Sequence, residues 1–461
     1  MIKEATLLRI SVFLFFFFIA SCLGVSGTGD ASEESGSRPN IVVIFVDALR
    51  PDKLGCYGFP AEISPEIDAL ARQGVRFKTA VAQATWTRPS IGSVLTSRYP
   101  RTLGIYRELD DSLNDRFMTL AEILKSNGYA TIGATANPNI NSVFNFEQGY
   151  DYYVGSDVVW EWMNPQAGEL QRSYTNKLKT AGDIFKTILN ILKSEKKRPF
   201  FVSTLVMEIH EKTQFAPRPE FSQLFTDKAR PEEREYYQMV RQVSKEIGDF
   251  VEKVLAMDSG QNTLFVILSD HGQGLYDHPH VENSKEHGHL LYESELKVPL
   301  IFSHPGSALK PAVVRRPVQL IDLMPTLLDY VGLKPPRGLD GHSLLPLING
   351  SGDHFELPRY FVAETYFRGS DKIAVYHPKW EYIENRDGQL GCDPRELQRN
   401  RVKQDGSLTD VLSKHAKIAQ ALKAFLDQWE KRYPKVKPTP CKDKTAMSKT
   451  LEQLKSLGYI K

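Results

Sequence analysis

The chain has 461 residues, of which 41% are apolar and 25% charged, and these fractions exclude a largely disordered protein. Its 58 basic and 56 acidic residues leave a formal net charge of +2, which argues against a protein built to bind nucleic acid. With only four cysteines, the fold is not one held together by a framework of disulfides.

The first residues have the pattern of an export signal. An apolar run at Val12–Ala20 is too short to span a bilayer but suits the core of a signal peptide. It ends in the letters IASC, which resemble a bacterial lipobox, in which the cysteine, here Cys22, is lipidated; an ordinary cleaved signal is the alternative. We predict a signal peptide over 1–21 and a flexible tether over 22–39. The protein is then exported to the periplasm or cell surface and anchored in the membrane by a lipid.

From residue 40 onward, β-branched and aromatic runs alternate with helical patterns. The run NIVVIFV at 40–46 predicts a strand that is buried on both faces. The later predicted strands are 130–134, 199–205, 263–268 and 298–302. The predicted helices are 65–73, 90–96, 120–126, 181–193, 232–255 and 320–330. This alternation predicts an α/β fold in which helices sandwich a mostly parallel sheet.

The pattern changes after about residue 350. Short strands are predicted at 360–363, 372–376 and 380–383, followed by a helix at 411–429. We therefore predict a catalytic domain over 40–350 and a small α+β subdomain over 351–461.

Side chains of the kinds that bind metals follow three of the predicted strands. They are Asp47, the pair Glu208 and His210, and the pair Asp270 and His271. Ligands of an open parallel sheet bind beyond the carboxyl ends of its strands, so these side chains should converge. A single aspartate at such a place often only caps a loop. Three such strand ends in one sheet indicate a metal site.

Five of the eleven histidines fall within residues 271–289. Imidazole is the commonest metal ligand near neutral pH, so one or two of them are expected to bind metal. The alternative is a solvated loop that is merely rich in histidine.

Thr87 lies just before Pro89 and the helical run 90–96. It is interpreted either as a helix N-cap or as a nucleophile. A hydroxyl at a helix N-terminus lies in positive potential, which favours both its alkoxide and an anionic substrate. Arg88, beside it, is a further candidate contact for the substrate anion.

The order of these motifs resembles the sulfatase family of the alkaline phosphatase superfamily, over roughly residues 39–350. The matching segments read RPNIVVIFVDALRPDKLGCYG, TRPSIGSVLTSRYP, SDHG, HGHLLYESELKVPLIF and GLDGHSLLPL. The resemblance implies an alkaline-phosphatase-like fold. It also implies that Asp47, Asp270 and His271 are the principal metal ligands, and that Thr87 is the nucleophile and contacts the metal.

Three further roles follow from the same resemblance. Glu208 and His210 match an acid-x-His element of a second metal or substrate site, to which His289 could also belong. His289, together with His287, matches the residues that contact the anionic group, and Asn137 matches an asparagine that stabilises the transferring oxyanion.

The chain departs from the family at the nucleophile. Sulfatases are expected to read Cys-x-Pro-x-Arg there, with the cysteine converted to formylglycine, whereas this chain reads TRPSI. Neither the cysteine nor the arginine is present, so formylglycine cannot form at this position. Ala48 also replaces a second aspartate. Because calcium prefers many oxygen ligands, this loss shifts the expected divalent metal toward zinc or manganese, with calcium still possible.

We therefore predict a metal-dependent hydrolase or transferase that acts through Thr87 on phosphate monoesters or diesters, or on related sulfate esters. His210 or His289 would protonate the leaving oxygen. The substrate would be a small anionic ester, or an ester carried on a lipid or glycan. Two alternatives stay open: a sulfatase that works without formylglycine, and a lipid-anchored binding protein that has lost catalysis.

Overall fold

The computed structural model describes residues 38–59, 62–164, 169–174, 179–211, 215–225, 230–278, 281, 284–307, 309–351, 360–388, 392–399, 411–442 and 444–456. The signal peptide and Cys22 lie outside the described residues, so export and lipid anchoring stay predictions. Labelling with palmitate that is lost in Cys22→Ser would test them. In the described part of the chain, no helix combines the length and the apolar character that a membrane span requires.

Strand β1 (Asn40–Val46) lies inside a sheet of eight strands in the order β12-β2-β11-β9-β1-β8-β4-β5. The others are β2 (Val75–Phe77), β4 (Ala130–Thr135), β5 (Tyr152–Val154), β8 (Phe200–Val206), β9 (Thr263–Leu268), β11 (Leu300–Ser303) and β12 (Ala312–Val314). Strands β9, β1, β8, β4 and β5 are parallel, whereas β11 runs antiparallel to both neighbours. Every residue of β1, β4, β8 and β9 is buried, as expected for parallel strands that are covered on both faces.

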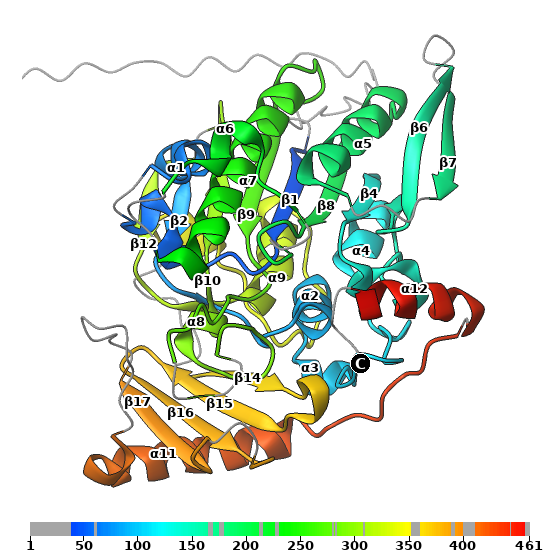
Figure 1. The fold of residues 1–461 in the computed structure, drawn as a ribbon. Helices are drawn as coiled ribbons and strands as arrows, with labels where there is room; N and C mark the ends of the chain where they lie inside the picture. Colours follow the sequence, from blue (N-terminus) through cyan, green and yellow to red (C-terminus); the bar gives the residue numbers. More distant parts are fainter. Residues whose placement is uncertain are drawn as a thin grey trace, which may run out of the picture. The chain divides into compact units, whose positions relative to one another are not determined.

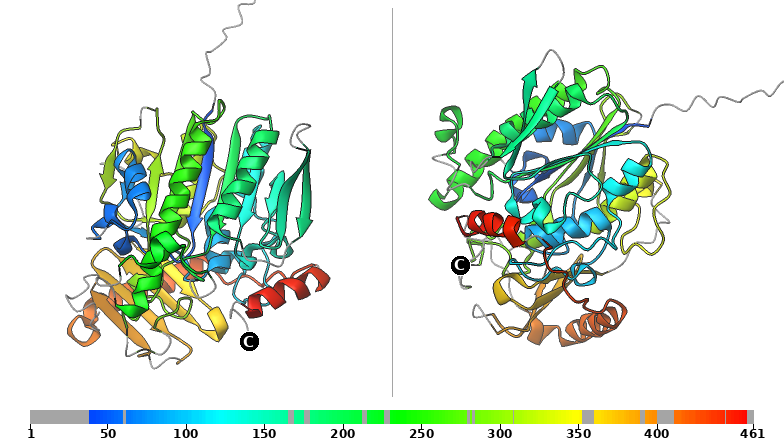
Figure 2. Two further views of the ribbon diagram at one scale, coloured as in Figure 1. Left: turned by 45° about the horizontal axis from the view of Figure 1, so that its top comes forward. Right: turned by 90° about the vertical axis from the view of Figure 1, so that its right-hand side faces the viewer.

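Helices cover both faces of this sheet (Figure 2). Contacts group α1 (Pro65–Arg72), α5 (Ala181–Ser194) and α7 (Pro231–Leu255) on one face. They group α2 (Thr87–Thr96), α4 (Leu120–Ser126) and α9 (Leu323–Tyr330) on the other. The arrangement confirms the predicted α/β fold with a mostly parallel sheet between helices.

A second, antiparallel sheet lies beside one end of the first (Figure 1). Its strands are β14 (Phe361–Thr365), β15 (Lys372–His377), β16 (Trp380–Asn385) and β17 (Arg395–Arg399). One face packs on α11 (Ala416–Arg432), and residues of the other face pack on the segment 290–296. Described residues from Arg38 onward belong to one compact unit, and the boundary predicted at residue 350 stays a prediction. No disulfide joins Cys392 and Cys441.

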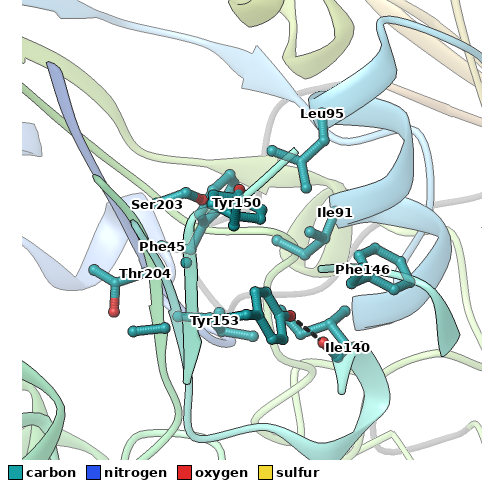
Figure 3. A pocket seen from close by; sticks show the side chains of 12 residues that line it. Phe45, Ile91, Leu95, Ile140, Phe146, Tyr150, Tyr153, Ser203 and Thr204 are labelled. Carbon is teal, nitrogen blue, oxygen red and sulfur yellow. Dashed lines mark hydrogen bonds between the residues drawn. The ribbon is translucent and has the colours of Figure 1, made fainter. Parts of the chain in front are cut away.

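A small pocket remains between α2 and the main sheet (Figure 3). Ile91 and Leu95 of α2 point into it, facing apolar side chains that include Phe45 and Phe146. None of the residues that line the pocket carries a carboxylate. The helix that begins at Thr87 therefore rests on the sheet through an uncharged, apolar contact.

Glu381 of β16, a strand of the second sheet, is fully buried. Neither of its carboxylate oxygens has a hydrogen-bond partner among the described residues. Burial raises the pKa of Glu381 from 4.5 to about 8; nearby Lys297 opposes this shift and Glu396 adds to it. The folded state thus holds this proton more tightly than the unfolded state does. The contribution of Glu381 to the free energy of unfolding is complete below about pH 4.5 and is lost as the pH rises to about 8.

We expect Glu381→Gln to remove this pH dependence, because glutamine stays uncharged. Between pH 5 and 8, the wild-type free energy of unfolding should fall by up to about 1.4 kcal/mol per pH unit more steeply than that of the variant. Urea unfolding at several pH values measures the two slopes. Glu252→Gln, at an exposed position of α7, is the matched control and should keep the wild-type slope. Equal slopes for the wild type and Glu381→Gln would contradict the assignment.

Candidate active site

Three buried side chains at the carboxyl ends of neighbouring strands form a potential metal site. Asp47 follows β1, and Asp270 and His271 follow β9, which pairs with β1 in parallel register. One ligand atom from each of the three residues lies within 4.8 Å of the others, and all three side chains are fully buried. Of the three strand ends that were predicted to converge, those of β1 and β9 thus lie together.

The donor set of these three residues, hereafter the triad, fits a divalent cation. Asp47 Oδ1 and Asp270 Oδ2 are buried without a hydrogen-bond partner among the described residues, and each lies 3.4 Å from His271 Nε2. His271 Nδ1 donates to the Gly272 carbonyl at 2.9 Å, which leaves the Nε2 lone pair facing the carboxylates. Burial, and repulsion by Asp270, raise the pKa of Asp47 to about 6 in the absence of metal. A cation would relieve both effects.

Asp270→Asn should therefore abolish most of the metal binding, because the amide supplies a neutral ligand in place of a charged one. We expect elemental analysis of dialysed protein to give about one divalent metal ion per wild-type chain and far less for the variant. Asp322→Asn is the control, since Asp322 is equally buried but accepts the N–H groups of Gln319 and His342 instead. An unchanged metal content in Asp270→Asn would exclude the triad as the site.

Thr87 is the first residue of α2, and Trp86 occupies the N-cap position. The interpretation of Thr87 as an N-cap was therefore wrong, which frees its hydroxyl for another role. Thr87 Oγ1 lies 3.5 Å from His271 Nε2 and accepts a hydrogen bond of 3.2 Å from Asn137 Nδ2. The hydroxyl is fully buried, beside the triad and at the positive end of the helix.

Asn137 links the threonine to the triad. Its Nδ2 donates to Asp47 Oδ2 at 2.7 Å as well as to Thr87, and its Oδ1 accepts the N–H of Asn139. It lies shortly after β4, at the start of a short helical turn, Pro138–Ile140. Asn137 thus fixes the orientation of the Thr87 hydroxyl, and its role in stabilising the transferring oxyanion stays a prediction.

Two histidines lie next to the triad. The His287 ring stacks on the His271 ring with centroids 4.4 Å apart, and His287 Nε2 lies 3.0 Å from His210 Nε2. His210 Nδ1 contacts Glu211 Oε1 at 2.7 Å, and His287 Nδ1 contacts Gln273 Oε1 at 2.9 Å. Burial disfavours the charged form of His210, yet Asp47 and Glu211 raise its pKa to about 9. No motif in the sequence singled out Glu211 or Gln273.

His289 lies farther along the same segment. Its ring packs against Phe367, with centroids 5.1 Å apart. Burial, and then the nearby Arg368 and Lys372, lower the pKa of His289 to about 4, so its imidazole is neutral at neutral pH.

The structure gives two predicted site residues other partners. Glu208 Oε2 accepts the N–H of Ala181 at the start of α5, and burial raises the pKa of Glu208 to about 7. The buried Arg88 guanidinium donates to the carbonyls of Arg107, Asp111 and Asn139. These three hydrogen bonds do not support a substrate contact for Arg88. Glu208 is not part of the triad, and its metal contact stays a prediction. Both side chains tie loops to the framework.

Residues 39–333 match the family model described as Sulfatase. This chain belongs to the sulfatase family. It is 26% identical over 375 residues to an ulvan-active sulfatase of Formosa agariphila, covering 75% of this chain and 71% of the relative. It is 24% identical over 381 residues to human N-acetylgalactosamine-6-sulfatase, covering 73% and 70% of the two chains.

Solved structures show the same fold. The phosphonate monoester hydrolase of Agrobacterium radiobacter superimposes with a TM-score of 0.68 at 18% identity, over 86% of this chain and 96% of that one. The chain is thus a sulfatase-family hydrolase with the alkaline-phosphatase-like fold. The family generally binds a divalent metal, which is consistent with the triad.

Proposed function

We propose that this sulfatase-family hydrolase cleaves, or transfers from, a phosphate ester or a related sulfate ester with Thr87 as its nucleophile. The observation that carries the proposal is the position of Thr87 Oγ1, in contact with Asn137 and 3.5 Å from His271 of the triad. Threonine has a hydroxyl that can form a covalent ester, and it needs no conversion to formylglycine.

The residues around Thr87 supply the metal site and the hydrogen-bond donors that the reaction needs. A divalent cation held by Asp47, Asp270 and His271 would supply a Lewis acid for the ester oxygens. Asn137 Nδ2 orients Thr87 Oγ1 and donates to charge that develops near it. The N-terminus of α2 favours negative charge at the same place.

The reaction proceeds in two displacements. Thr87 Oγ1 gives up its proton and forms a bond to phosphorus or sulfur as the bond to the leaving oxygen breaks. The leaving oxygen keeps the electron pair and takes up one proton, so that no net proton is gained or lost in this step. Water, or an acceptor hydroxyl, then displaces Thr87 from the phosphorus or sulfur and restores its hydroxyl. His210 is the better proton donor of the two predicted histidines, because His289 is neutral at neutral pH.

The substrate class that we propose is an anionic ester on a saccharide. This substrate class is supported by the names of the relatives, which include an ulvan-active sulfatase and N-acetylgalactosamine-6-sulfatase. The same names favour the second candidate function, a sulfatase that works without formylglycine.

Turnover of three 4-nitrophenyl esters by the purified full-length chain separates the candidates. The esters are a phosphate monoester, a phosphodiester and a sulfate, each measured with zinc, manganese or calcium added. We expect one of the phosphate esters to be the best substrate. A preference for the sulfate supports the second candidate, and no turnover by a metal-loaded chain supports a binding protein without catalysis.

A further inference from the structure

A loop of the second sheet contacts the histidine segment of the site. This loop, residues 366–371, connects β14 and β15. Just before it, Thr365 Oγ1 donates to the Gly288 carbonyl. The ring of Phe367, within the loop, packs on the rings of Trp86 and His289, with centroids 5.5 and 5.1 Å apart. Trp86 precedes the nucleophile, so the loop forms part of the wall of the site.

Gly288 permits this contact. Its φ of +88° is unfavourable for other residues, and a Cβ there would lie 2.7 Å from the Phe367 ring. The approach between the loop and the histidine segment therefore depends on the absence of a side chain at Gly288.

Arg368 follows Phe367 and is exposed, although its backbone is left-handed, with φ 50° and ψ 40°. A non-glycine residue in this conformation is strained, and such strain is concentrated at functional sites. The Arg368 N–H donates to Glu108 Oε1, and this buried carboxylate holds the backbone in place. The guanidinium carbon lies 5.0 Å from the centroid of the Phe367 ring, which itself contacts Trp86 and His289.

We propose that Arg368 determines specificity by binding a second anionic group of the substrate, outside the ester that reacts. The inference rests on the proposed function, because it assumes that an anionic saccharide ester occupies the site. An arginine guanidinium binds carboxylate and sulfate groups through two parallel hydrogen bonds, which suits a uronate or a further sulfate on the same sugar. Arg368 is exposed and contacts the site through Phe367, which suits recognition and not chemistry. Its charge already affects the site, since it contributes to the low pKa of His289.

Two sugars that share one ester and differ by one anionic group test this role. The probes are N-acetylglucosamine 6-sulfate and N-sulfoglucosamine 6-sulfate, titrated calorimetrically into the metal-loaded full-length chain. We expect the wild type to bind the N-sulfated sugar at least about tenfold more tightly. Arg368→Gln should lose this preference and keep its affinity for the N-acetylated sugar, and Arg368→Lys should keep part of the preference.

Arg315→Gln is the matched control, because Arg315 is an exposed arginine just after β12, at the edge of the main sheet. It should keep the wild-type preference. A wild type without the preference, or an Arg368→Gln variant that retains it, overturns the inference. Equal losses of affinity for both sugars also overturn it, since they indicate a general electrostatic or structural effect.

Turnover of the same sugars separates this inference from the proposed function. If neither sugar nor any 4-nitrophenyl ester is cleaved, the proposed function fails. A binding preference that depends on Arg368 would still establish the anion site in that case.

Discussion

Replacing Thr87 with alanine should lower kcat at least about a thousandfold with the substrate that the wild type turns over best, because the nucleophile is lost. The fold and the metal content should be unchanged. Asn137 Nδ2 keeps its bond of 2.7 Å to Asp47, and the three triad residues Asp47, Asp270 and His271 all remain in the variant. Steady-state kinetics, circular dichroism and elemental analysis measure the three properties.

Thr96→Ala is the matched control, since Thr96 lies on the same helix, is also buried, and donates its hydroxyl hydrogen bond locally, to the Gly92 carbonyl at 2.7 Å. Its kcat should stay within a few-fold of the wild type. Thr87→Ser, which retains a hydroxyl, should retain measurable turnover. A Thr87→Ala variant with wild-type kcat would show that the nucleophile lies elsewhere and would favour direct attack by water.

Ile91→Arg should destabilise the protein by about 3 kcal/mol or more, although it restores the arginine of the sulfatase motif. Ile91 is 2% exposed and lines the pocket between α2 and the sheet, among apolar side chains such as Phe45 and Phe146 (Figure 3). A guanidinium there would be buried without a carboxylate partner. Urea unfolding of the two proteins measures the difference.

Ile91→Met is the comparison that isolates the charge, because methionine has a similar volume and should cost less than about 1.5 kcal/mol. If Ile91→Arg proved as stable as Ile91→Met, the pocket would have to accommodate a cation. The expected loss of stability in Ile91→Arg also bears on whether the formylglycine motif can be restored. The packing beneath α2 has adapted to an apolar residue, so restoring the formylglycine motif would take more than the two substitutions at Thr87 and Ile91.

The sequence predicted the framework well where the local signal was strong. The runs at 40–46 and 263–268 became strands with the predicted bounds, and the helix at 120–126 begins at a capping box formed by Thr119 and Glu122. The strands β2, β5 and β12 were not predicted, because three residues are too few to show a period. The hairpin of β6 (Val158–Asn164) and β7 (Glu169–Tyr174) was also missed.

The centre of the site was predictable for a related reason. Parallel strands end at the same edge of a sheet, so Asp47 and Asp270 had to lie close together once both strands were recognised. The direction in which Arg88 and Glu208 point was not predictable, because it depends on carbonyls and N–H groups of distant loops. No local sequence pattern predicted that Phe367, in the loop after a strand of the second sheet, would contact the site.

Because Gly288 contacts the second sheet, the active site is complete only after that late part of the chain has been synthesised. The nucleophile and the triad lie within residues 47–271, but Thr365 and Phe367, which hold the segment carrying His287 and His289, are made later. A nascent or truncated chain that ends before β14 would contain every proposed metal ligand of the triad, yet its histidine wall would lack support. Activity should therefore appear only near the completion of the chain.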